Sequence, residues 1–246
     1  MNKALRAGLS AVGIALSFLS ATGRARADEA GDRALAALDE ATNRAKSYYF
    51  EFDVLNKDGT RLALIVRLKG DKRLTEFTAP ADMKGTKVLI LSTTQTYVYL
   101  PAFGKVRRVA SSVSDQGFMG MTFTPDDFTT IFSPQYTATI ASDSPAEMKL
   151  VAVAKAGQTP PYARVDFTIA KDRFLATEVK YFNAAGTNVK TEVRTGYTCE
   201  GNICTPSEQT MTDNTKNGAW TKMSRKAWRV NVDLSDDLFS KRALEH

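Results

Sequence analysis

The chain has 246 residues, of which 43% are hydrophobic and 24% are charged, and its formal net charge is +6. That length suits one domain of the larger all-β kind. Four basic residues, Lys3, Arg6, Arg24 and Arg26, lie in a predicted export signal, so the mature chain carries only about +2 and no nucleic-acid partner is indicated. The only histidine is His246, which leaves no internal histidine for general-base catalysis or zinc binding.

Residues 1–27 have the features of a cleaved secretory signal peptide. A basic start is followed by an apolar run over residues 7–19 and by the small-x-small triplet Ala25-Arg26-Ala27. The apolar run is shorter than the roughly 20 residues that a membrane span needs. We therefore expect an exported chain that begins at Asp28, and the alternative is an uncleaved anchor helix.

The first element of the mature chain is predicted to be an amphipathic helix over Asp28–Lys46. Ala34, Leu35 and Leu38 fall on one stripe of that helix, and acidic residues gather near its start. From residue 48 onward the apolar period changes to two, which is typical of half-buried strands. The predicted strands are Tyr48–Val54, Leu62–Leu68, Leu74–Thr78, Lys87–Leu91, Thr96–Leu100, Val165–Ile169, Ala176–Asn183, Val189–Tyr197, Ile203–Thr212 and Trp220–Asn231.

These strands predict a long antiparallel meander that is apolar on one side and polar on the other. A single helix cannot cover so many strands, so the sheet must curl on itself into a barrel or half-barrel. With this many strands, the interior can be wider than its own side chains fill. The sequence therefore predicts an apolar cavity.

A short helix is predicted over Pro125–Phe132, within the stretch that separates the two groups of strands. Thr124 can cap this helix, and Asp126 and Asp127 favour its N-terminus. Paired-carboxylate catalysis is the alternative role for the two aspartates. Adjacent residues on a helix do not face each other, so we interpret both aspartates as capping residues.

Cys199 and Cys204 are the only cysteines, and Gly201-Asn202 lies between them. An exported chain meets an oxidising compartment, so we predict a disulfide that closes a β-hairpin. Redox activity would require the spacing C-x-x-C instead. At the other end of the chain, residues 244–246 resemble the start of an expression tag, which leaves residues 28–243 as one domain.

The stretch "YVYLPAFGKVRRVASSVSDQGFMGMTFTPDDF" resembles the bacterial family of outer membrane lipoprotein-sorting proteins, relatives of the periplasmic carrier LolA. The family has a Tyr-x-Tyr-Leu-Pro strand, a Lys-x-Arg-Arg step, a Phe-Met-Gly triplet and an acidic helix start. The matching residues here are Tyr97, Tyr99, Leu100, Pro101, Lys105, Arg107, Arg108, Phe118, Met119, Gly120, Phe123, Thr124, Asp126 and Asp127.

The resemblance implies a mainly β fold, a strongly curved antiparallel sheet that forms a half-open β-barrel with an N-terminal helix and short lid helices. It also implies a monomeric periplasmic carrier of lipid acyl chains or lipidated proteins, without enzymatic activity, cofactor or metal. An inner-membrane transporter and an outer-membrane acceptor would be its partners. The segment from Phe103 to Phe132 would be the lid.

The residues expected to line the lid and cavity are aromatic residues and methionines, whose flexible thioether suits guests of variable shape. They are Tyr97, Tyr99, Phe103, Phe118, Met119, Met121, Phe123 and Phe128. Basic residues at the rim, Lys105, Arg107 and Arg108, would meet a lipid phosphate or an acidic partner. The alternative is that the apolar residues only fill the core and the basic ones form a solvated edge.

Three other functions stay open on the sequence alone. An envelope stress sensor could bind lipoproteins with the same fold and the same cavity. An outer-membrane β-barrel would share the signal peptide and the alternating strands, but it would not need the helix over Asp28–Lys46. A secreted hydrolase would need a nucleophile, and the sequence contains no nucleophile elbow.

Overall fold

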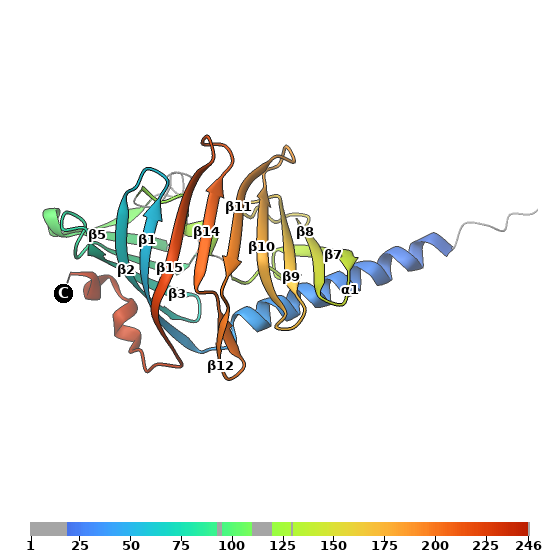
Figure 1. Cartoon of the computed structure of the whole chain (residues 1–246), viewed down its shortest axis with the longest axis horizontal. Coiled ribbons are helices and arrows are strands. Elements are labelled where there is room, and N and C mark those ends of the chain that lie inside the picture. Colours follow the sequence, from blue (N-terminus) through green and yellow to red (C-terminus); the bar gives the residue numbers. More distant parts are fainter. Residues whose placement is uncertain (1–18, 93–94, 110–119, 129, 246) are drawn as a thin grey trace, which may run out of the picture.

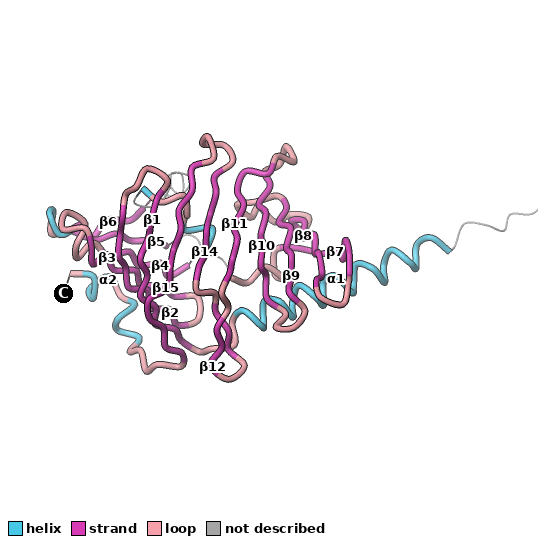
Figure 2. The backbone as a smooth tube through the Cα atoms, viewed as in Figure 1, coloured by secondary structure: helices cyan, strands magenta, loops and turns pink. Residues whose placement is uncertain are grey.

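The structure, a computed structural model, describes residues 19–92, 95–109, 120–128 and 130–245. In these residues, thirteen antiparallel strands form one strongly curved sheet, and two short strands form a separate hairpin (Figure 1, Figure 2). The order along the sheet is β6-β5-β4-β3-β2-β1-β15-β14-β11-β10-β9-β8-β7. The strands are β1 (Ser47–Asn56), β2 (Arg61–Lys69), β3 (Lys72–Ala79), β4 (Lys87–Ser92), β5 (Gln95–Leu100), β6 (Lys105–Val109), β7 (Tyr136–Asp143), β8 (Glu147–Ala154), β9 (Arg164–Ala170), β10 (Leu175–Phe182), β11 (Asn188–Thr195), β12 (Thr198–Glu200), β13 (Ile203–Thr205), β14 (Glu208–Asp213) and β15 (Ala219–Val230).

The sheet consists of two meanders that meet where β1 pairs with β15. Its two edge strands, β6 and β7, follow each other along the chain but lie at opposite ends of the sheet. The sheet is an open half-barrel, and Met121, Phe123 and Phe128, in the connection between its edges, lie on its inner face. We call residues 120–128 and 130–133, which belong to the described part of that connection, the crossing segment. This architecture confirms the predicted mainly β, half-open barrel.

The N-terminal helix α1 (Leu19–Thr42) covers the inner face of one half of the sheet, along β7, β8 and β10. Leu35 and Leu38 enter the same core as Phe167 of β9. The helix was predicted over Asp28–Lys46, but it begins before the predicted cleavage site, extends beyond β7 (Figure 1), and ends at Thr42. Cleavage after Ala27 stays a prediction. Among the described residues, no helix is long and apolar enough to cross a bilayer.

The C-terminal residues cover the outer face of the other half of the sheet. They form the 3-10 helix η5 (Asp236–Phe239) and the short helix α2 (Lys241–Leu244). A second apolar cluster forms there, in which Leu74, Leu89 and Tyr97 pack against Leu234, Phe239 and Leu244. Leu244 is 0% exposed. Leu244 thus packs with the fold, and the interpretation of residues 244–246 as the start of a tag stays a prediction.

The connection between the sheet edges differs from the predicted lid. Residues 105–109 form the edge strand β6, which pairs with β5 after the 3-10 turn η1 (Pro101–Phe103). The helix predicted over Pro125–Phe132 is only a 3-10 turn, η4 (Pro125–Phe128). The backbone groups of residues 130–132 instead bond to the end of α1 and the residue after it: Asn43 donates to the carbonyl of Thr130 at 2.9 Å, and Asp39 accepts from the backbone N–H of Phe132 at 3.0 Å.

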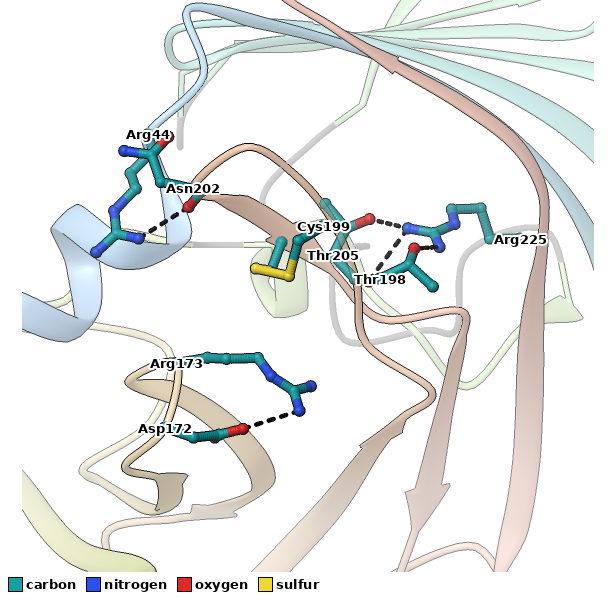
Figure 3. Close-up of a disulfide and its surroundings, with 9 residues drawn as sticks. Arg44, Asp172, Arg173, Thr198, Cys199, Asn202, Thr205 and Arg225 are labelled. Atoms are coloured by element: carbon teal, nitrogen blue, oxygen red, sulfur yellow. Dashed lines mark hydrogen bonds and ion pairs between the residues drawn. A yellow bond between two sulfur atoms is a disulfide. The ribbon is translucent and has the colours of Figure 1, made fainter.

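The predicted disulfide is present, and it joins Cys199 of β12 to Cys204 of β13 (Figure 3). The hairpin also has polar contacts on both sides. Arg44, just after α1, donates to the carbonyl of Asn202 at 2.8 Å, and Arg225 of β15 donates to Thr198 and Thr205. The hairpin thus bridges the helix and the sheet at one end of the half-barrel.

Candidate functional site

A cavity of about 380 Å³ lies on the inner face of the half-barrel, in the half that α1 leaves uncovered. Its walls come from β1, β2, β3, β11, β14 and β15, from the first residue of β10, from the crossing segment, and from the end of the disulfide hairpin. The end of α1 and residues after it, Thr42, Asn43, Ala45 and Lys46, also border it. This volume falls in the range of about 300–1,000 Å³ that is typical of sites for small molecules. The location follows from the fold, because the other half of the inner face is filled by α1.

The sheet side of the cavity is apolar because alternate residues of β1 and β2 point inward. Cross-strand pairing places them in rows, so that Tyr48 lies opposite Leu68, Phe50 opposite Val66 and Phe52 opposite Leu64. The three aromatic rings of β1 form a continuous surface, since neighbouring ring centroids are 5.5 Å apart. All six of these residues line the cavity.

The crossing segment forms the opposite wall. Met121, Phe123 and Phe128 line the cavity, and the rings of Phe123 and Phe128 stack with centroids 5.6 Å apart. Thr122, between the first two, holds the segment to the sheet: its N–H donates to Thr221 Oγ1 at 2.8 Å, and its hydroxyl donates to the carbonyl of Met211 at 2.9 Å. The apolar wall is therefore fixed to β14 and β15.

Asp127 is the buried polar anchor of the crossing segment. Its carboxylate accepts hydrogen bonds from the backbone N–H of Thr124 at 2.7 Å, from Tyr162 at 2.5 Å and from Lys190 Nζ at 2.5 Å. Burial, and after it the charge of Asp127, raises the pKa of the Tyr162 hydroxyl above its ordinary value, so that it stays a donor. Capping was predicted for Asp127, but its ion pair with β11 was not.

A second buried ion pair, between Glu192 and Arg194 of β11, also borders the cavity. Two hydrogen bonds of 2.9 and 2.8 Å join their side chains, and Tyr181 donates to the same carboxylate at 3.1 Å. Burial alone would lower the pKa of Arg194, but the charge of Glu192 outweighs it and raises that pKa. Burial, and after it Glu192, also raises the pKa of Tyr181.

Arg73 of β3 also lines the cavity, and it differs from the two buried ion pairs because it has no charged partner within the part of the chain that the structure describes. Its guanidinium carbon lies 4.2 Å from the ring centroid of Phe128. Burial lowers the pKa of Arg73 to about 10. Among the described residues, no carboxylate lies within ion-pair distance of this side chain.

The structure brings only some of the predicted ligand-binding residues together. Met121, Phe123 and Phe128 lie on the cavity wall, and their contact with a guest stays a prediction. Phe118 and Met119 lie outside the described residues. Phe103 is 62% exposed on η1 and lies away from the cavity, with Arg107 5.7 Å from its ring centroid.

Two of the predicted cavity residues lie on the wrong face. Tyr97 and Tyr99 point to the outer side of β5, where they pack in the C-terminal cluster, and Lys241 Nζ lies 4.6 Å from the ring centroid of Tyr97. The inner position between them is Val98. Alternation shows that the two tyrosines share a face, but it does not show which face looks inward.

The predicted rim residues are exposed on the edge strand β6, and none of them lines the cavity. Lys105, Arg107 and Arg108 therefore sit where the alternative interpretation, a basic solvated edge, placed them. A basic edge strand also discourages pairing with other chains. The part of the chain that the structure describes contains no group of three or more histidine, cysteine, aspartate or glutamate residues arranged to hold a metal ion.

The residues on the sheet side of the cavity were not predicted from the sequence as part of the site. The alternating pattern of Phe50, Phe52, Leu64 and Val66 is visible in the sequence, but alternation alone does not distinguish a packed core from a cavity wall. Arg73 was also missed, because a single arginine at the start of a strand carries no signal of its own.

A family model described as "Uncharacterized protein" matches residues 69–246 of the chain. The search of curated proteins found no match to this chain. Among solved structures, a domain from Vibrio parahaemolyticus named for outer membrane lipoprotein sorting is 20% identical, with a TM-score of 0.80 over 89% of this chain and 100% of that one. A DUF1329 family protein from Desulfovibrio piger is 22% identical, with a TM-score of 0.79 over 89% and 99% of the two chains.

A LolA superfamily protein from Nitrosomonas europaea is 17% identical, with a TM-score of 0.69 over 87% of this chain and 98% of that one. At these identities the likeness concerns the fold. It confirms the LolA-like half-barrel that the motif around Pro101 predicts. The match extends over nearly the full length of all three structures.

Proposed function

We propose that this chain, which belongs to the family matched over residues 69–246 and has a LolA-like fold, binds the acyl chain of a lipid or of a lipidated protein in the cavity of the half-barrel. The observation that carries the proposal is the apolar cavity of about 380 Å³ between β1–β3 and the crossing segment. Both of its main walls are made of aromatic, branched and methionine side chains, which suit a flexible hydrocarbon guest.

The energetics fit reversible carriage rather than chemistry. Transferring a chain of about 12 methylenes from water into such a cavity gains about 10 kcal/mol, at roughly 0.8 kcal/mol per methylene. Relative to a bilayer the gain is close to zero, because the membrane interior is equally apolar. Small biases from partner proteins are then enough to load and unload the guest, and no covalent step is needed.

The cellular role that we propose is transport across the periplasm between envelope membranes. The predicted signal peptide and the disulfide both fit an exported chain. The Vibrio protein, named for lipoprotein sorting, has the same fold. An inner-membrane donor and an outer-membrane acceptor are the partners that this role requires. A stress sensor that binds lipoproteins would use the same cavity, and the identity of the partners distinguishes it from a carrier.

A substitution that fills the cavity tests the proposal. Leu68→Trp places an indole on the inner face of β2 near the cavity mouth. It should lower affinity for an acyl probe such as dodecanoate by roughly tenfold, since the loss of two methylene contacts costs about 1.6 kcal/mol. Ile65→Trp adds the same ring on the outer face of the same strand, and it should leave affinity unchanged.

Native mass spectrometry of the exported protein and both variants measures the bound fraction directly. Equal acyl binding by Leu68→Trp and Ile65→Trp would show that the guest does not occupy this cavity. A wild-type protein that neither retains nor takes up any acyl-bearing molecule would overturn the proposed function as a whole.

A further inference from the structure

The rows of cross-strand neighbours on the inner face of β2 and β3 change from charged to uncharged from the cavity mouth inward. The mouth lies near the exposed turn between β2 and β3, where Gly70 and Asp71 border the cavity. Arg73 lies opposite Leu68 in the row next to this turn, whereas the next two rows place Thr75 opposite Val66 and Phe77 opposite Leu64. Across the inner face of β2 and β3, only the row at the mouth contains a charged residue, and the next two rows contain Thr75 and Phe77 in its place.

The other buried charged groups that line the cavity are paired within the protein, whereas Lys46 and Asp71, which also line it, are exposed. Lys190 and Asp127 form one ion pair at 2.5 Å, and Arg194 and Glu192 form another at 2.8 Å. In the described part of the chain, Arg73 makes no ion pair and no hydrogen bond, and its guanidinium lies over the Phe128 ring instead.

The remaining carboxylate at the cavity, Asp71, is exposed on the turn and lies beyond ion-pair distance of Arg73. A net positive charge therefore remains inside the apolar cavity. Its lowered pKa of about 10 is still about three units above neutral pH, so the side chain stays protonated there.

A half-buried cation without a counter-charge is unfavourable in the empty cavity. The cost is relieved when a guest supplies an anion. A guanidinium is well matched to that purpose, because its planar fork donates two parallel hydrogen bonds to a carboxylate or a phosphate. The contact with Phe128 holds the arginine against the crossing segment and limits the orientations that it must lose on binding.

We propose that Arg73 is the binding subsite for the anionic head group, a carboxylate or a phosphate, of an amphiphile whose acyl chain fills the apolar rows beyond it. This inference rests on the proposed function, because the tail must occupy the same cavity. It adds selectivity: a neutral ester with the same tail should bind more weakly. It also sets the direction of the guest, with the head at the mouth and the tail toward Phe52, Leu64 and Met223.

The test compares three probes with the same tail: dodecanoate, dodecyl phosphate and the neutral methyl ester of dodecanoate. The wild-type protein should bind at least one of the anions about tenfold or more tightly than the ester, which is the effect typical of a charge-assisted hydrogen bond. Whichever anion is preferred identifies the head group as a carboxylate or a phosphate. This comparison requires no variant.

Variants show whether Arg73 is the source of the preference for the anions over the ester. Arg73→Met should bring the affinities for anion and ester to within about twofold and leave ester binding unchanged or stronger, since the methionine adds apolar wall. Arg73→Lys should keep part of the preference. Arg67→Met is the matched control, because it removes the same charge from the outer face of the adjoining strand, where Arg67 pairs with Glu76 at 3.2 Å. It should leave the preference intact.

The outcomes distinguish failure of the anion subsite from failure of acyl binding. Tight but equal binding of anions and ester by the wild-type protein would overturn the anion subsite and leave the acyl-binding function standing. A preference that Arg73→Met retains, or that Arg67→Met abolishes, would also overturn it. Failure of all three probes to bind would overturn the proposed function, and the subsite with it.

Discussion

Asp127 is the residue on which the position of the crossing segment depends most. It holds the backbone of Thr124 and binds Lys190 and Tyr162, which come from a strand and a loop of the second half of the sheet. Tyr162 lies 35 residues from Asp127 along the chain, and Lys190 lies 63 residues from it. Loss of this carboxylate would release the cavity wall and leave a buried ammonium group without its counter-charge.

Asp127→Ala should lower the free energy of unfolding by about 3–5 kcal/mol, the usual cost of removing one partner of a buried ion pair. Urea denaturation of the variant measures this loss. Glu147→Ala is the control, because the pair of Glu147 with Lys149 is about half exposed, and such pairs contribute at most about 1 kcal/mol. Equal losses in the two variants would contradict the role given to Asp127.

Buried tyrosines give the protein a predictable sensitivity to alkali. Burial raises the pKa of Tyr136 to about 12, with a smaller contribution from the charge of Asp126. The pKa of an unfolded tyrosine is about 10. The folded state therefore favours the neutral hydroxyl, so its contribution to stability is complete below pH 10 and disappears as the pH rises through 12.

The free energy of unfolding should stay nearly constant from pH 7 to pH 9 and then fall between pH 10 and pH 12. Denaturation at several pH values, with tyrosinate absorbance followed in parallel, measures it. Tyr136→Phe should reduce the slope in the alkaline range. An unchanged slope in that variant would show that Tyr136 does not contribute to the alkaline loss.

At the scale of secondary structure, α1 lies unusually close to strand β7. A Cβ atom at Gly31 would be 1.9 Å from the carbonyl oxygen of Ala138 and 2.4 Å from its carbonyl carbon. Asp32, the next residue, accepts a hydrogen bond from the backbone N–H of Ala138 at 2.7 Å. The glycine in the middle of a helix, normally unfavourable, is therefore explained by close packing between two backbones.

Gly31→Ala should destabilise the protein although alanine is the better helix former. The gain in helix propensity is about 1 kcal/mol, whereas overpacking against backbone atoms costs about 1–3 kcal/mol and shifts the helix off the sheet. Thermal or chemical denaturation shows whether the free energy of unfolding rises or falls in this variant. Ala36→Gly, at an exposed position of the same helix, should cost only about 1 kcal/mol. A Gly31→Ala variant more stable than the wild type would contradict this packing.

The strands that could be predicted from the sequence are those in which apolar and polar residues alternate clearly. β1 and β2 alternate clearly between large apolar and polar residues, and both were predicted. β7 was not, because its inward position under the helix is Ala138, too small to give a strong pattern. β8 was not predicted either, since Leu150, Val151, Ala152 and Val153 form a continuous apolar run that periodicity cannot assign.

Only those residues of the candidate site that lie close together in the sequence could be predicted. Met121, Phe123 and Phe128 were found because they cluster in one stretch. Tyr97 and Tyr99 were misplaced because the outer face of β5 is covered by the C-terminal residues, a contact more than 130 residues distant that no local pattern reveals. Asp127 and Lys190 were not connected for the same reason.

At the scale of the whole molecule, the two halves of the inner face have different roles. α1 fills the half formed by β7–β10 and gives it a conventional core. The crossing segment, held by Asp39 at one end and by Asp127 and Thr122 at the other, covers the second half without filling it. The cavity is thus the space that one helix and one short segment leave inside a sheet too large for them.

The most direct test of this account is a crystal structure of the protein soaked with a dodecanoate brominated at its terminal carbon. Anomalous scattering then locates the bromine without interpretation of weak density. We predict one bromine site deep in the cavity, near Phe52, Leu64 and Met223, with the carboxylate toward the turn between β2 and β3. Bromine found only on the outer surface, with the cavity closed around its own side chains, would contradict the account.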